Sequence, residues 1–277
     1  MSIVRGKPFV RGIAVLVFAA AALAPSRPVF AADDAAAKDA AQKFTALDAQ
    51  IRAHIKDKSL DALKKDVEEV SKALGDQTDP KQRTRFGTLL GLIVNGTTDD
   101  GVQSVVIVAI GNTKDSANFQ FIRRFLAQPD LDAEPPLLKP AIEAAGKLVA
   151  DDAVLPLMTI VEKSHLLPIA SAAMGAFSLY GTHKAVRSKI LQSLVDTVSK
   201  DRPGVGVRWD ASMGDPVQTA KTRTNELSRQ RWDALSGVLV TTLNKMTGTQ
   251  GATAEDWFKL RDDYKGGLDR LFVDPAK

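Results

Sequence analysis

Apolar residues recur three and four positions apart over most of the chain, a spacing typical of amphipathic α-helices. The pattern is clearest between residues 132 and 200, in the segments 137–149, 153–162, 166–180 and 185–199. The joints between these segments are only a few residues long. Helices this short cannot bury their apolar stripes alone, so the pattern predicts helices stacked on their sequence neighbours.

The segments before residue 132 follow the same period. Apolar positions mark one helix within residues 44–55 and a second within 60–74, with Ser59 as its expected N-cap. We expect these two helices to form an αα-hairpin. Residues 32–43 are rich in alanine and charge and predict a loosely held helix.

Helix starts are also marked farther along the chain. Asp79-Pro80 predicts one, because proline at the first helical position loses no hydrogen bond. Residues 105–110 form a β-branched run that propensity alone would permit as a strand. No partner strand is visible elsewhere, so a buried helix is expected there.

The region after residue 200 changes character. Residues 201–221 contain three glycines and two prolines and show almost no apolar periodicity, which predicts a long insertion loop. A helix is expected from Thr222 to Gly248. Thr253 and Asp256 then have the spacing of a capping box and predict the start of a last helix.

Two segments of the helical block can be aligned with each other. Ala144-Ala145-Gly146 corresponds to Ala173-Met174-Gly175 at a shift of 29 residues, and Ala109-Ile110-Gly111 lies 35 residues before the first of them. Small residues let neighbouring helices approach closely, so an alanine and glycine seam is expected where repeats touch. The helix lengths and this seam resemble HEAT-type repeats over about residues 80–246.

This resemblance implies an all-α, HEAT-like α-solenoid of stacked antiparallel helix pairs with an N-terminal capping αα-hairpin. Residues 243–248 followed by Trp257 resemble the closing segment of exported bacterial HEAT-repeat proteins, although Leu260 and Arg261 stand where those proteins often carry further tryptophans. An irregular helical bundle is the alternative. The expected divisions are a signal peptide (1–31), the hairpin cap (32–75), the repeat domain (76–248) with its insertion loop (201–221), and a C-terminal capping helix (249–277).

The first residues have the layout of a secretory signal peptide. Arg5, Lys7 and Arg11 precede an apolar run at residues 13–24, and small residues precede an expected cut after Ala31. The run is shorter than the ~20 residues that span a bilayer. We therefore expect an exported protein, periplasmic or extracellular, with no stable membrane insertion after cleavage.

The net charge and the absence of cysteine exclude several further classes of function. The chain has 37 basic and 33 acidic residues, and the four basic residues of the signal segment leave 33 of each sign. A near-neutral mature chain argues against a general affinity for nucleic acid or anionic membrane. Cysteine is absent, which excludes disulfides, thiolate metal sites and cysteine nucleophiles and favours a bacterial setting.

Candidate chemistry is sparse. His54, His165 and His183 do not share a helical turn, so no catalytic or metal-binding residues and no cofactor are predicted. The acidic pairs Asp99-Asp100 and Asp151-Asp152 occur where helices are expected to begin. Carboxylates there are stabilised by the helix dipole, so we interpret them as structural.

A partner-binding surface is the remaining candidate site. The insertion loop carries Arg208 and Trp209, and the helix after it carries Arg229, Arg231 and Trp232. Arginine and tryptophan are enriched at protein interfaces, so we expect these residues to contact a protein or peptide partner. Alternatively, Trp209 packs against a neighbouring helix as a local plug.

Three functions remain open from the sequence. The favoured hypothesis is a non-catalytic protein–protein interaction scaffold, because stacked repeats form extended binding surfaces. The first alternative is an enzyme or accessory enzyme subunit with a site at residues 201–221, whose candidate groups are Asp201, Arg202, Arg208, Asp210, Asp215 and Lys221. The second is a structural component of the cell envelope.

Overall fold

The structure is a computed structural model that describes residues 30–77, 79–127, 136–203, 215–250, 252–264 and 267–272, with side chains described outside 30–37 and 215–225. The chain divides into two compact units, Met1–Ala41 and Gln42–Lys277. The boundary falls inside the first helix, α1 (Phe30–Lys56). The described part of the first unit is therefore one stretch of helix, and the second unit contains all the other elements.

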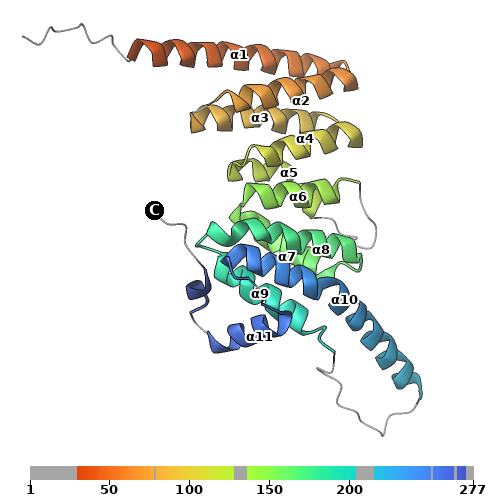
Figure 1. Cartoon of the computed structure of the whole chain (residues 1–277). Helices are drawn as coiled ribbons and strands as arrows, with labels where there is room; N and C mark the ends of the chain where they lie inside the picture. The colour runs from red at the N-terminus through yellow and green to blue at the C-terminus, as the bar shows by residue number, and fades with distance from the viewer. Residues whose placement is uncertain are drawn as a thin grey trace, which may run out of the picture. The chain divides into compact units, whose positions relative to one another are not determined.

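All regular structure in these described ranges is helical, which confirms the all-α prediction. In its described residues the second unit continues from α1 with ten α-helices and three short 3-10 helices (Figure 1). Their bounds are α2 (Leu60–Gly75), α3 (Pro80–Gly96), α4 (Asp100–Asn112), η1 (Ser116–Asn118), α5 (Phe119–Leu126), α6 (Leu138–Leu148), α7 (Asp151–Lys163), α8 (Leu167–Ala176), η2 (Phe177–Thr182), α9 (Arg187–Ser199), α10 (Asp215–Thr247), α11 (Ala254–Asp263) and η3 (Leu268–Leu271).

Contacts within the second unit sort its helices into two sets (Figure 1). In the first set, α2, α4, α6, α8 and α10 each contact the next helix in that order. In the second set, α3, α5, α7, α9 and α11 do the same. Helices that follow each other in sequence, such as α2 and α3 or α7 and α8, join the two sets. We call these sets the even layer and the odd layer.

Glycine and alanine hold the even layer at close range. A Cβ added to Gly111 of α4 would lie 2.7 Å from the Cα of Ala144 on α6. A Cβ added to Gly146 of α6 would lie 2.9 Å from the Cβ of Ala176 on α8. Neither position has space for a side chain, so the predicted seam is confirmed at both glycines. Gly175 differs, because an added Cβ there meets no atom within 4 Å.

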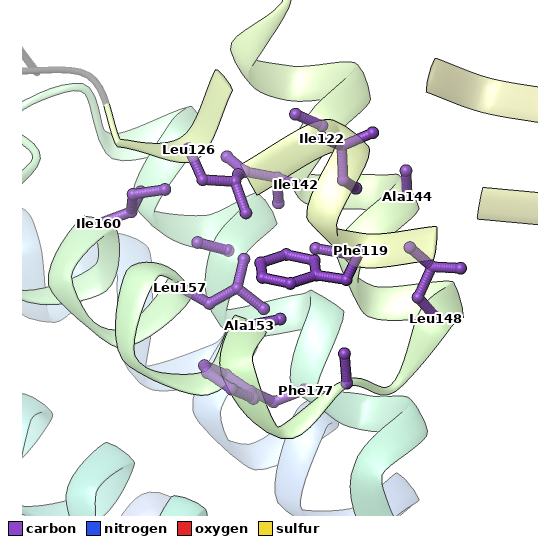
Figure 2. Packing of buried hydrophobic residues seen from close by; sticks show 14 of the residues in the cluster. Phe119, Ile122, Leu126, Ile142, Ala144, Leu148, Ala153, Leu157, Ile160 and Phe177 are labelled. Carbon is purple, nitrogen blue, oxygen red and sulfur yellow. The ribbon is translucent and has the colours of Figure 1, made fainter. Parts of the chain in front are cut away.

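The core between the layers is built from large apolar side chains. Figure 2 shows the ring of Phe119 on α5 beside Leu157 and Ala153 of α7. All three are buried, as is Ile142 of α6. The apolar positions of α5 share one face and are also buried, namely Phe119, Ile122, Phe125 and Leu126. Burial of this stripe accounts for a helix of only eight residues, which would be marginal alone.

Side-chain hydrogen bonds between neighbouring helix pairs recur at a regular sequence distance. Several of them join residues 30 to 35 positions apart. Arg124, for example, donates to the carbonyl oxygen of Val94, and Lys147 donates to the Asn112 side chain. The distance matches the shifts of 29 and 35 residues in the sequence alignment.

Most predicted helix starts are found in the structure. Asp79 caps α3 by accepting a hydrogen bond from the Lys81 amide at 3.1 Å, with Pro80 at the first position. Thr253 and Asp256 form both bonds of a capping box at the start of α11. The β-branched run at residues 105–110 lies inside α4, so the helix prediction is confirmed there. Ser59 occupies the N-cap position of α2 but makes no capping hydrogen bond through its side chain.

Two expected boundaries differ from the structure. α10 begins at Asp215 rather than Thr222, so residues 215–221 are helical and not part of a loop. Asp215-Pro216 is the same start signal as Asp79-Pro80, and the glycines around it obscured that signal. The last helix ends at Asp263, and residues 268–271 form the separate turn η3. No described helix is both long enough and apolar enough to cross a membrane.

Candidate functional site

A groove opens where α6 ends and α7 begins. Val149 ends α6 in the left-handed conformation, with φ at 50°, which is strained for a β-branched residue by about 1–3 kcal/mol. Ala150 is then extended, and Asp151 and Asp152 occupy the first turn of α7. This tight corner directs the start of α7 toward α5. Asp151 and Asp152 therefore line the groove rather than only flanking a helix.

The opposite wall comes from η1 and the start of α5. Asp115 accepts a hydrogen bond from the Ala117 amide at 3.0 Å and so fixes the turn that leads into α5. Buried Phe119 lies at the apolar base of the groove. The groove has a volume of about 720 Å³ and is open to solvent. Its lining residues are Ser116, Ala117, Phe119, Gln120, Arg123, Val149, Ala150, Asp151, Asp152 and His183.

His183 reaches the groove from the segment between η2 and α9. Its Nε2 lies 2.7 Å from Oδ1 of Asp151. Its ring is stacked on that of Tyr180, with the ring centres 6.3 Å apart and the planes at 8°. These two contacts fix the imidazole at the border of the groove. The pair joins residues of two different helix pairs, which is why spacing along the sequence did not reveal it.

The buried side chain of Tyr180 contacts the corner between α6 and α7 through its hydroxyl. Its hydroxyl lies 3.2 Å from the Ala150 carbonyl oxygen and 3.4 Å from that of Ala145, and it donates to this pair of acceptors. Burial, and then the negative charge of Asp151, raise the pKa of Tyr180 above its ordinary value. The phenol therefore stays protonated and keeps η2 attached to the corner between α6 and α7.

Two charged side chains in the groove have no partner within the described part of the chain. Arg123 on α5 and Asp152 on α7 make no hydrogen bond or ion pair there. Their immediate neighbours do: Arg124 donates to the Val94 carbonyl oxygen at 2.7 Å, and Asp151 pairs with His183. Each wall of the groove thus presents one unpaired charge, and the two charges are of opposite sign.

The sequence-predicted partner residues do not meet at this groove. Arg208 and Trp209 lie outside the described residues. Arg229 is on α10 with a 71% exposed side chain, 4.0 Å from Asp233. Trp232 is half-buried, its ring centre 5.9 Å from that of Phe258 on α11. A role of Arg229 and Trp232 in binding stays a prediction.

Arg231 is held inside the molecule. Its Nη1 donates to the Ser164 carbonyl oxygen and its Nη2 to that of Val161, both at 2.9 Å. Its Nε lies 3.1 Å from Oδ2 of Asp201. The guanidinium thereby satisfies carbonyl groups at the end of α7 that have no partner in their own helix. Arg231 joins α10 to α7 and to the end of α9, and most of its donors are used in these contacts.

Residues at the start of the insertion loop are also paired within the chain. Asp201 bonds to Arg231, and Arg202 lies 2.6 Å from Glu255 on α11. His54 pairs with Asp66, a fully buried carboxylate on α2, at 2.7 Å. No group of three or more histidine and carboxylate side chains in the described ranges could hold a metal ion.

No protein-family model matches this chain, and the comparison with curated proteins finds no match. The groove and the recurring spacing of contacts between helix pairs are therefore the observations on which a function is proposed.

Proposed function

We propose that this protein is an exported, non-catalytic scaffold whose helical repeats, arranged as a HEAT-like α-solenoid, bind a protein or peptide partner through the groove between α5 and α7. The observation that carries the proposal is the groove itself, in which Arg123 and Asp152 have no partner among the described residues while their neighbours are used by the fold. Charged groups at a protein surface give a partner orientation and specificity.

The repeat architecture is supported by two regularities of the second unit. Contacts within each layer run from one helix to the next but one, as expected when helix pairs stack in sequence. Glycine contacts also fall at the spacing of the hydrogen bonds: Gly111 meets Ala144, Gly146 meets Ala176, and an added Cβ at Gly91 would meet the Phe121 ring. Equivalent positions of consecutive repeats would give this spacing.

Export is supported by the sequence of residues 1–31. The basic start, the apolar run at 13–24 and the small residues before Ala32 have the order of a cleaved signal peptide. Mass spectrometry of the exported protein should find an N-terminus at Ala32. An intact Met1 or quantitative retention in the membrane would contradict export.

Site-specific photo-crosslinking in cells that export the protein tests the binding role. A photoreactive residue at Gln120, which lines the groove and is exposed, should crosslink to one discrete protein. The matched control is the same residue at Val108 on α4, whose side chain is 41% exposed in the even layer. Crosslinks at neither position, or equal crosslinks at both, would argue against binding at the groove.

A further inference from the structure

The groove has a distribution of charge that restricts what it can bind. Arg123 on α5 supplies a positive charge on one wall and Asp152 a negative charge on the other, and neither has a partner in the described part of the chain. Both line the same space, but no ion pair joins them. A single occupant that carries both signs of charge can satisfy both walls, whereas a polyanion or polycation would be repelled by one of them.

On each wall of the groove, the fold uses one charged residue and leaves its like-charged sequence neighbour without a partner in the described residues. On α5, Arg124 donates to the end of α3 while Arg123 faces the groove. On α7, Asp151 holds His183 while Asp152 remains without a partner in the described structure. In both places the fold uses one member of a like-charged pair. The second member makes no hydrogen bond or ion pair within the described residues.

The apolar surfaces fit a peptide chain better than a small molecule. The volume of about 720 Å³ is within the usual range for ligand sites, but the groove is open, while small-molecule sites bury most of their ligand. Phe119 and Ala150 provide apolar contact between the charged walls. Leu155 follows Asp152 by about one helical turn on α7 with 75% of its surface exposed, so an apolar side chain of a segment that continues along α7 could contact it.

We propose that the groove between α5 and α7 binds a peptide segment carrying a basic side chain that faces Asp152 and an acidic side chain that faces Arg123. This inference rests on the proposed function and names the chemistry of the partner at the same site. Leu155 receives an apolar side chain of the segment beside the basic one. The two charge contacts fix the direction and register of the segment on the groove.

Peptide display on the mature protein tests this inference without knowledge of the natural partner. A random-peptide library selected on the wild-type protein should be enriched in sequences that carry both signs of charge. Arg123→Glu should shift the selection toward basic peptides, and Asp152→Lys should shift it toward acidic peptides. Each change should weaken the best wild-type peptide about tenfold.

Rescue by reciprocal charge makes the test specific. A peptide in which the acidic residue is replaced by lysine should regain affinity for Arg123→Glu and lose it for the wild-type protein. The matched controls are Lys139→Glu and Glu143→Lys, which make the same charge changes at exposed positions of α6 in the even layer. Circular dichroism and melting curves establish that each variant is folded, and Asp152→Asn serves as a milder change at the start of α7.

The outcomes separate this inference from the proposed function. Selection of the same peptides by the wild-type protein and both groove variants would overturn the inference, as would enrichment of uniformly apolar or singly charged peptides. Failure to enrich any peptide would overturn it as well. If crosslinking from Gln120 still yields a discrete partner in any of these cases, the binding role of the groove stands and only the assigned peptide chemistry is wrong.

Discussion

Gly111 and Gly146 in the even layer have no room for a methyl group, whereas Arg123 and Asp152 in the odd layer face a groove of about 720 Å³. The two regions are close in sequence, because α6 carries Gly146 and α7 begins only a few residues later. They differ in how closely they are packed and in whether charged side chains are left without a partner in the described residues. At the seam the space beside Gly111 and Gly146 is filled by Ala144 and Ala176, while the groove retains charges and space.

Under the proposed function, the even layer would hold the helices together and the odd layer would bind the partner. Close contact in the even layer, where glycine meets alanine, supplies packing that does not depend on charge. The odd layer meets through larger side chains and through hydrogen bonds to helix ends, such as that from Arg124 to Val94. Removal of an unpaired surface charge from the odd layer should therefore change the free energy of unfolding only slightly.

The largest effect is expected at the seam. Gly146→Leu should lower the free energy of unfolding by about 3 kcal/mol, because the new side chain would overlap Ala176 of α8. Two smaller substitutions, each of a glycine by alanine, serve as matched controls. Gly146→Ala should destabilise, whereas Gly175→Ala should be neutral or stabilise by about 0.5–1 kcal/mol, since its Cβ meets no atom. Urea unfolding of all three variants measures this, and equal effects of the two alanine changes would contradict the seam.

The second effect is expected at the link between α7 and α10. Arg231→Met should cost about 2–3 kcal/mol, because charged donors to the carbonyl groups of Val161 and Ser164 are removed. Arg229→Met is the matched control on the same helix and should change stability by less than about 0.5 kcal/mol. Urea unfolding again gives both values. A larger loss from the Arg229 change would mean that Arg231 does not join these helices.

A smaller effect is expected at the end of the odd layer. Thr253→Ala removes the side-chain acceptor of the α11 capping box and should cost about 1 kcal/mol. Thr253→Ser keeps the hydroxyl and should retain most of the stability. Thermal unfolding of the two variants distinguishes them, and the cap would be unimportant if both behaved like the wild-type protein.

The smallest effect at neutral pH is expected at Tyr180, where Tyr180→Phe removes a hydrogen bond worth about 1 kcal/mol or less. The stability difference between the wild-type protein and Tyr180→Phe shrinks in alkali. Because the pKa of Tyr180 is raised in the folded protein, its contribution is complete below about pH 10 and is lost as the pH rises above that value.

Unfolding by urea at pH 8 and pH 11 measures this dependence. The wild-type protein should lose more stability between the two values than Tyr180→Phe does. Tyr264→Phe is the control, since the protein has two tyrosines and Tyr264 is 39% exposed. An identical alkaline loss in wild-type protein and Tyr180→Phe would show that Tyr180 is not the group responsible.

The sequence predicted most of the helices because their signals are local. Asp79-Pro80 and Thr253 with Asp256 mark helix starts, and the three- and four-residue spacing marks buried faces such as that of Phe119 and Ile122. The start of α10 at Asp215 was not predicted, because the glycines just before it are typical of a loop and outnumber the local start signal.

The groove could not be predicted in the same way. Asp151-Asp152 was correctly placed at a helix start, but its position opposite Arg123 depends on how α5 and α7 pack together. The same holds for His183, whose partner Asp151 belongs to a different helix pair. Arg231 is the opposite case. The sequence suggested that its side chain contacts a partner, and in the structure the side chain joins α10 to the end of α7. Only the fold distinguishes a charge that is paired within the described residues from one that is not.

Hydrogen exchange followed by mass spectrometry measures most directly whether the odd layer binds while the even layer only holds the stack. The mature protein is compared with and without the best peptide from the wild-type selection. Exchange should slow at residues 116–123 and 149–152, on the two walls of the groove, and should stay unchanged along the α4–α6 seam. Protection concentrated on α4 and α6, or a bound peptide that leaves both walls unprotected, would contradict this division between the layers.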